Sequence, residues 1–231
     1  MNNKEKIYKL LIEQNRLNTI INKNWKSDRT VDDFKLAILV ESGELLDHIG
    51  YKWWKHQVMD LKQSQMEVID IWFFFFSIIV LKEKNLEFVD DMIENSPFFY
   101  DEPDVKLSID NIKNDVIILV NEITNDDISF DQKNMIILSK LSMSLGLTFN
   151  DAYKLYMGKL ILNIFRQDNG YIEGSYVKIW NGKEDNEVLM TLMDENNDIE
   201  IVKSLLKSKY KLILDKIKSD LMRNLVNHNY D

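Results

Sequence analysis

The chain has 231 residues, of which 45% are hydrophobic and 11% aromatic, so it can bury a large core, and we expect a single all-α domain over residues 1–231. With only 7 Gly and 2 Pro, the chain has few of the turn-forming residues that a many-stranded β fold needs. The absence of Cys excludes disulfides, thiolate metal sites and thiol nucleophiles, and a formal net charge of -9 argues against direct nucleic-acid binding.

Apolar residues at three- and four-residue separations predict a helical bundle. The N-terminal segment has no apolar signal-peptide core, so we expect a cytoplasmic protein. Asp32 or Asp33 is expected to cap the second helix, and Gly50 suits its left-handed end. The predicted helices cover residues 4–23, 34–48, 61–84, 108–121, 131–145, 150–165 and 198–226, with turn-rich connections at 51–60, 95–103 and 121–130.

Residues 71–81, IWFFFFSIIVL, form the most apolar run of the chain, interrupted only by Ser77. The run is about half as long as a transmembrane helix requires, so we expect a buried helix and no membrane partner. So wide an apolar surface predicts packing on several sides, either in the core of a monomer or against a second subunit.

Residues 166–186, RQDNGYIEGSYVKIWNGKEDN, break the helical pattern with three Gly and two Asn-Gly pairs. Asn-Gly favours tight turns between short strands, and functional side chains are often carried on such connections. We therefore expect a functional loop or a short hairpin here.

Two pairs of acidic residues lie on neighbouring predicted helices. Glu41 and Glu44 are three residues apart, as are Glu67 and Asp70, so each pair projects from one helix face. If the helices pack antiparallel through residues 50–60, the four carboxylates face a common pocket, where their repulsion requires cations or bound protons. Mg²⁺ fits because it prefers oxygen ligands and combines carboxylates with substrate phosphates. The alternative is a pair of solvated helix faces.

The acidic pairs belong to a longer series of motifs. The series is ESGE at residues 41–44, YKWWK at 51–55, EVIDIW at 67–72, Lys159, LNIFRQDNGYIEGSYVK at 162–178 and EDN at 184–186. In this order the motifs resemble the dimeric, all-α dUTPase family. The paired acids alone would also fit the wider MazG-like pyrophosphohydrolases, but the FRQDNGY tract points to the dUTPase branch. The resemblance implies a homodimer that uses Mg²⁺ to hydrolyse dUTP, and also dUDP, with attack on dUTP at the β-phosphorus giving dUMP and pyrophosphate.

By this resemblance, each candidate site residue has an expected role. The metal ligands are Glu41, Glu44, Glu67 and Asp70. One glutamate of the first pair, with Glu44 favoured over Glu41, also orients or deprotonates the attacking water. The residues that approach the phosphates are Lys159, Arg166, Tyr171, Lys178 and Lys55. The nucleoside contacts are Gln14, Asn18, Trp54, Asn163 and Asn169.

Several of these assignments have structural alternatives. Without the family motifs, Gln14 and Asn18 would be an exposed helix surface. Trp54 would be a core anchor, and Arg166 would merely anchor the end of its helix. A lone His48 beside acids is left without a role. The competing functions are a dCTP or broader nucleotide pyrophosphohydrolase and a noncatalytic helical interaction protein.

Overall fold

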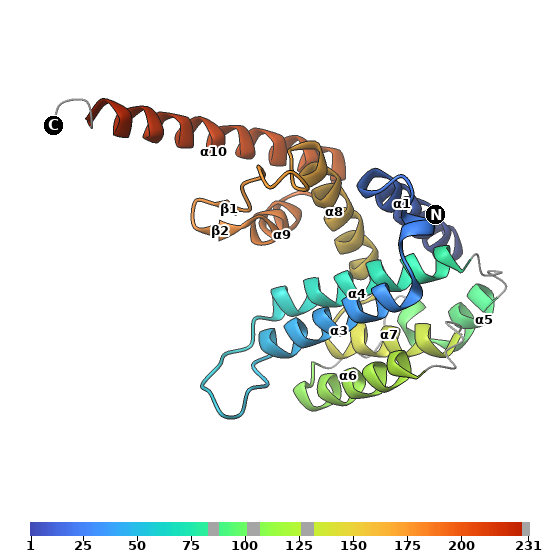
Figure 1. Cartoon of the computed structure of the whole chain (residues 1–231). Coiled ribbons are helices and arrows are strands. Elements are labelled where there is room, and N and C mark those ends of the chain that lie inside the picture. Colours follow the sequence, from blue (N-terminus) through green and yellow to red (C-terminus); the bar gives the residue numbers. More distant parts are fainter. Residues whose placement is uncertain (83–87, 101–106, 126–131, 228–231) are drawn as a thin grey trace. The chain divides into compact units, whose positions relative to one another are not determined.

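The computed structural model describes residues 1–82, 88–100, 107–125 and 132–227 and is almost entirely helical (Figure 1). With 76% of the chain in helices, the all-α expectation is confirmed. The chain divides into two compact units, Met1–Leu160 and Ile161–Asp231. The expectation of one domain stays a prediction.

The first unit contains seven α-helices, one 3₁₀ helix and the first part of an eighth α-helix among its described residues. These are α1 (Asn3–Ile21), α2 (Trp25–Asp28), α3 (Val31–His48), α4 (Leu61–Leu81), α5 (Phe88–Asn95), η1 (Pro97–Phe99), α6 (Ile109–Thr124), α7 (Gln132–Ser144) and α8 (Phe149–Asp168). The second unit takes the end of α8 and continues with β1 (Ile179–Trp180), β2 (Lys183–Glu184), α9 (Asp185–Glu195) and α10 (Ile199–Asn227).

The predicted helices of both units are found within a few residues of their expected bounds. The expected cap of α3 was wrong, because the N-cap is Thr30, whose hydroxyl accepts from the Asp33 amide while the Asp33 carboxylate accepts from the Thr30 amide. The short helices α2 and α5, the 3₁₀ helix η1 and the helix α9 were not predicted. Parts of the expected connections at 95–103 and 121–130, and of the helices at 61–84 and 131–145, lie outside the described residues.

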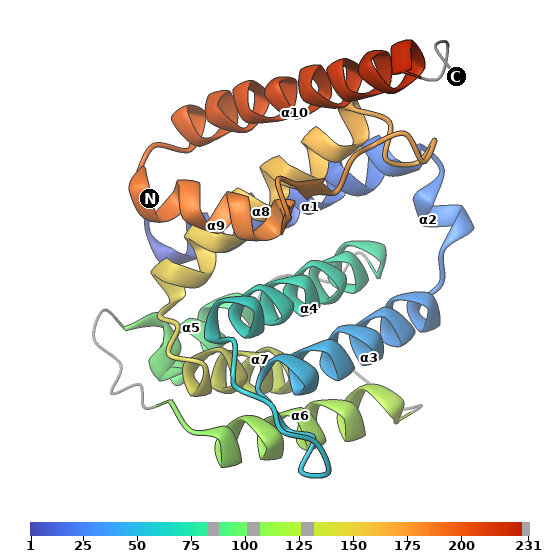
Figure 2. The ribbon, with the colours of Figure 1, turned by 90° about the vertical axis from the view of Figure 1, so that its left-hand side faces the viewer.

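Helix α4 runs through the middle of the first unit, with α1 on one side and α3 and α7 on the other (Figure 2). Most of its apolar run is buried, including Ile71, Phe75 and Phe76, so the apolar run is covered within this chain. By length and composition, α4 is also the one helix of the described segments that qualifies as a membrane span, but 72% of its most apolar window is buried inside the protein. Core helices of soluble proteins pass the same test.

Helices α3 and α4 form an antiparallel pair and lie side by side in both views (Figures 1 and 2). The chain leaves α3 through Gly50, whose φ of +73° is the expected left-handed helix end. The Asp60 amide then donates to the His48 carbonyl at 2.8 Å, which closes the connection where α4 begins. This closure fixes how the two acidic helices face each other.

In the second unit, the tract after α8 forms the expected short hairpin. Strands β1 and β2 are antiparallel, with Trp180 opposite Lys183. The turn between them is Asn181-Gly182, with φ of 51° and 84°, as a type I′ turn requires. The hairpin runs directly into α9, whose first residue is Asp185.

Two glycines near the end of α3 should respond to alanine with opposite signs. Gly50→Ala should lower the free energy of unfolding by about 1 kcal/mol, because a Cβ is strained at positive φ. Gly43→Ala should raise it by roughly 0.5–1 kcal/mol, because Gly43 is inside α3 and a Cβ there would meet no described heavy atom within 4 Å. Urea unfolding of both variants measures this, and a Gly50→Ala variant as stable as the wild type, or more stable, would refute the assignment of the turn.

Candidate functional site

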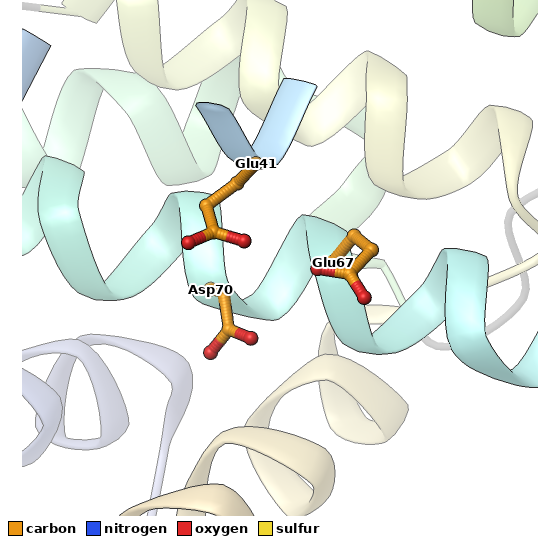
Figure 3. Close-up of side chains that lie close together, drawn as sticks. All are labelled: Glu41, Glu67 and Asp70. Carbon is orange, nitrogen blue, oxygen red and sulfur yellow. The ribbon is translucent and has the colours of Figure 1, made fainter. Parts of the chain in front are cut away.

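Three carboxylates from α3 and α4 converge in the first unit (Figure 3). One carboxylate oxygen from each of Glu41, Glu67 and Asp70 lies within 4.8 Å of the others. The α4 pair shares a face because its members are one helical turn apart, and the antiparallel pairing brings Glu41 of α3 toward them. Glu67 is only 5% exposed, and Glu41 and Asp70 are half-buried. We call these three residues the acid cluster.

The acid cluster holds more negative charge than its surroundings easily tolerate. Burial, followed by repulsion from Asp70, raises the pKa of Glu41 to about 7 and that of Glu67 to about 8, from an ordinary 4.5. The buried Lys159 ammonium lies 2.8 Å from an Asp70 oxygen and offsets part of this charge. An all-oxygen, strongly anionic donor set is the kind that binds a divalent cation such as Mg²⁺, so the residues present fit that metal.

The fourth expected acid, Glu44, lies outside the acid cluster and is exposed. Its charge still raises the pKa of Glu41, so the two carboxylates are near neighbours. The expected convergence of four carboxylates is therefore seen for three. His48, left without a role from the sequence, lies with Nε2 3.5 Å from a Glu67 oxygen. Its position two turns after Glu41 is the signal that places it on this face.

The amide pair expected to contact the nucleoside is buried. Gln14 is 2% exposed and Asn18 9%, so the alternative of an exposed helix surface was wrong. Both amides donate to the Ser77 hydroxyl, and Gln14 accepts from the Tyr156 hydroxyl. Sequence reasoning did not find Ser77 or Tyr156. The available signal for Ser77 was its place as the one polar residue of the apolar run, seven residues after Asp70.

The connection between α3 and α4 presents an exposed aromatic group. Trp54 is 61% exposed, so its alternative role as a core anchor was wrong. Its ring contacts those of Tyr51 and Trp53 edge-on, with centroids 6.3 and 5.5 Å away. Lys55 follows it and is also exposed, so both expected contacts are accessible in the first unit.

In the second unit, Arg166 is buried and engaged with other protein groups. Its Nε and Nη2 donate to the two oxygens of the fully buried Asp185 at 2.8 and 2.7 Å. The remaining nitrogen donates to Asn163 Oδ1 at 3.0 Å, and the guanidinium lies 5.6 Å from the Tyr171 ring centroid. This fork-to-fork pair connects the end of α8 to the start of α9. The sequence placed Asp185 in the EDN motif at 184–186 but gave it no role.

The last two expected contacts lie elsewhere in the second unit. Asn169 donates to the Phe165 carbonyl at 2.8 Å and thereby caps the end of α8. Lys178 is exposed, and its ammonium lies 3.1 Å from a Glu184 oxygen across the hairpin. Tyr171 is 45% exposed. Within this unit, the structure therefore joins Asn163, Arg166 and Tyr171 but leaves Asn169 and Lys178 with separate partners.

Comparison with known families gives one result. Residues 6–171 match the family model described as dUTPase. This range includes the acid cluster, the buried amide pair and Arg166, whereas Lys178 and Asp185 lie beyond its end. A search of the curated proteins found no match.

Metal-free protein should lose stability as the pH rises. Unfolded glutamates release their protons near pH 4.5, whereas Glu41 and Glu67 in the folded protein hold theirs until about pH 7 and 8, so their contribution is lost across that window. Mg²⁺ binds the charged carboxylates and should therefore stabilise the protein more at pH 8 than at pH 5.5. Thermal melts with EDTA or Mg²⁺ test this, with Glu67→Gln as control. A Mg²⁺ effect that is equal at both pH values, or retained by the variant, would contradict the assignment.

Replacing Arg166 separates its two possible roles. Arg166→Lys keeps the charge but loses the fork to buried Asp185, so stability should fall by about 1–3 kcal/mol. Asp185→Asn breaks the same pair from the other side. If Arg166 only anchors α9, the two variants should lose turnover in proportion to stability. If it also binds phosphate, Arg166→Lys should lose more kcat/KM than Asp185→Asn at equal folded fraction.

Proposed function

The chain belongs to the all-α dUTPase family and is a dUTP-hydrolysing enzyme, and from this premise we propose that it releases dUMP and pyrophosphate in a Mg²⁺-dependent reaction and also accepts dUDP. We further propose that it acts as a homodimer in the cytoplasm. The dimer rests on the family resemblance alone, because the apolar run of α4 is covered within one chain. The lack of Cys is compatible with a reducing compartment.

The acid cluster carries this proposal. Glu41, Glu67 and Asp70 would hold the metal, with Glu44 beside them on α3. When bound, Mg²⁺ neutralises the carboxylates, offsets charge on phosphate oxygens and makes water more acidic. A noncatalytic scaffold would have no need of carboxylates held in positions that raise the pKa of two of them.

Glu44 is our choice for the base that takes the proton from the attacking water. Its carboxylate is exposed and lies outside the acid cluster, so it is available for proton transfer while Glu41 serves the metal. When the water attacks the β-phosphorus, the bond breaks between the β-phosphorus and the oxygen that bridges to the α-phosphorus. The electron pair leaves with that oxygen on dUMP, and the water oxygen stays on pyrophosphate.

Helix α4 supplies the axis along which the nucleotide lies. Asp70 and Ser77 are seven residues apart on one helix face, about 10 Å along the axis, so the acid cluster and the buried amide pair are neighbours on one side of α4. The phosphates would meet the acid cluster and Lys159, and the base would meet Gln14 and Asn18. Helix α8 supports both ends, because Lys159 pairs with Asp70 and Tyr156 bonds to Gln14.

The remaining contacts are proposed from the family resemblance. Trp54 would cover the nucleoside and Lys55 would assist the phosphates, which their exposure permits. By the same resemblance, Tyr171 and Lys178 would approach the phosphates. Three further residues, Arg166, Asn163 and Asn169, make the protein contacts described above, so any substrate contact by them would add to a positioning role.

Product analysis tests the reaction and the base together. Wild-type protein with Mg²⁺ should convert dUTP to dUMP and pyrophosphate and should be inactive in EDTA, whereas release of phosphate with dUDP would refute the proposal. Glu44→Gln should lower kcat by at least about a hundredfold with unchanged circular dichroism, because it keeps size but removes the proton acceptor. Asp32→Asn, another exposed acid of α3, is the matched control and should keep wild-type activity. Substantial Glu44→Gln turnover would remove Glu44 from this role.

A further inference from the structure

Four polar side chains from three helices meet in the interior of the first unit. They are Gln14 and Asn18 of α1, Ser77 of α4 and Tyr156 of α8. Their exposed fractions are 2%, 9%, 1% and 1%. Buried amides are costly unless their donors and acceptors are matched, so the arrangement of their hydrogen bonds matters.

A backbone carbonyl sets the direction of the hydrogen bonds in this network. The Phe73 carbonyl can only accept a hydrogen bond, and the Ser77 hydroxyl donates to it at 2.8 Å. With its one hydrogen used, the Ser77 oxygen can only accept. Both amides must then turn their nitrogens toward it, and they do so at 3.0 Å for Gln14 and 2.9 Å for Asn18. The orientation of the two amides thus follows from hydrogen-bond chemistry.

The rest of the network agrees with this orientation. The second N–H of Gln14 donates to Asn18 Oδ1 at 2.9 Å, and Gln14 Oε1 accepts from the Tyr156 hydroxyl. Burial raises the pKa of Tyr156 well above its ordinary value, so its phenol is a neutral donor. The Tyr156 ring is also stacked on Phe73, with centroids 4.0 Å apart, which fixes where the hydroxyl lies.

We propose that Ser77 is a positioning residue for pyrimidine selection. Its hydroxyl donates to the Phe73 carbonyl and can therefore only accept from Gln14 and Asn18, which fixes the orientation of both amides. We call this arrangement the relay. This inference rests on the proposed function, in which the two amides meet the base. Among the described residues, Asn18 keeps one N–H without a partner, and each amide oxygen has one further lone pair. The amides therefore offer a donor and acceptors in a fixed order.

This fixed order distinguishes uracil from cytosine. Uracil presents a donor at N3 and an acceptor at O4, whereas cytosine presents an acceptor at N3 and a donor at N4. Rotating an amide by half a turn exchanges its donor with its acceptor, so a free amide could serve either base. An amide whose orientation Ser77 fixes is complementary to uracil. Against cytosine it places a donor opposite a donor or an acceptor opposite an acceptor, which a buried site tolerates poorly.

The test compares kcat/KM for dUTP and dCTP with Mg²⁺ in variants of Ser77. Ser77→Ala removes the relay, and Ser77→Cys keeps the size but substitutes a weak donor and acceptor. Both variants should lower the ratio of kcat/KM for dUTP to kcat/KM for dCTP by at least about tenfold, chiefly through KM. Ser77→Thr retains the hydroxyl and should keep the ratio. Ser139→Ala is the matched control, because Ser139 is buried and makes the same bond to a carbonyl four residues back, at 2.7 Å. It should change thermal stability without changing the ratio.

The outcomes separate the relay from the proposed function. If wild-type protein shows no preference for dUTP over dCTP, dedicated uracil selection and the relay both fail. If wild-type protein prefers dUTP and folded Ser77→Ala or Ser77→Cys keeps that preference, the relay alone is overturned. Should Ser77→Ala fail to fold, the isosteric Ser77→Cys decides the question. A fall in the ratio for Ser139→Ala equal to that for Ser77→Ala would show a general effect of core loosening and would overturn the relay as well.

Discussion

The burial of Glu67 beside Glu41 and Asp70 is the constraint on which the rest of the structure depends. Carboxylates placed this close in a partly dry site repel one another, and neither α3 nor α4 would adopt this arrangement for its own stability. The stabilisation comes from elsewhere on α4, where residues 71–81 bury a wide apolar surface against neighbouring helices. One helix therefore carries both a large buried apolar surface and two of the closely spaced carboxylates, so the packing of α4 holds these carboxylates in place.

The same helix also orders the site along its length. Asp70 and Ser77 lie on one face of α4, and α8 meets this face twice, through Lys159 at the acidic end and Tyr156 at the amide end. A substrate with a charged end and a hydrogen-bonding base suits such a face, because each end meets a different chemistry. In the proposed function, cations would offset the phosphate charge, whereas the direction of hydrogen bonds would select the base. The helices of the first unit hold the acid cluster and the buried amide pair within one core.

The second unit is organised by one buried ion pair. Arg166 at the end of α8 and Asp185 at the start of α9 satisfy each other through two parallel hydrogen bonds, with Asn163 and Asn186 completing the guanidinium's partners. A buried pair of this kind contributes little net stability, but it is costly to break from one side. It therefore fixes the course of the tract between the two helices, in which Tyr171 and Lys178 are exposed.

Most of the long helices and the candidate acids could be predicted from the sequence, because the 3.6-residue period and the one-turn spacing of Glu67 and Asp70 are local properties. It also located the turn at Asn181-Gly182, since that turn type follows from two residues. Which side chains contact one another depends on the tertiary structure. Gln14 bonds to Ser77 across 63 residues and to Tyr156 across 142, distances over which no periodicity carries information. Packing alone selects such partners, because buried polar groups are satisfied only by what folding brings beside them.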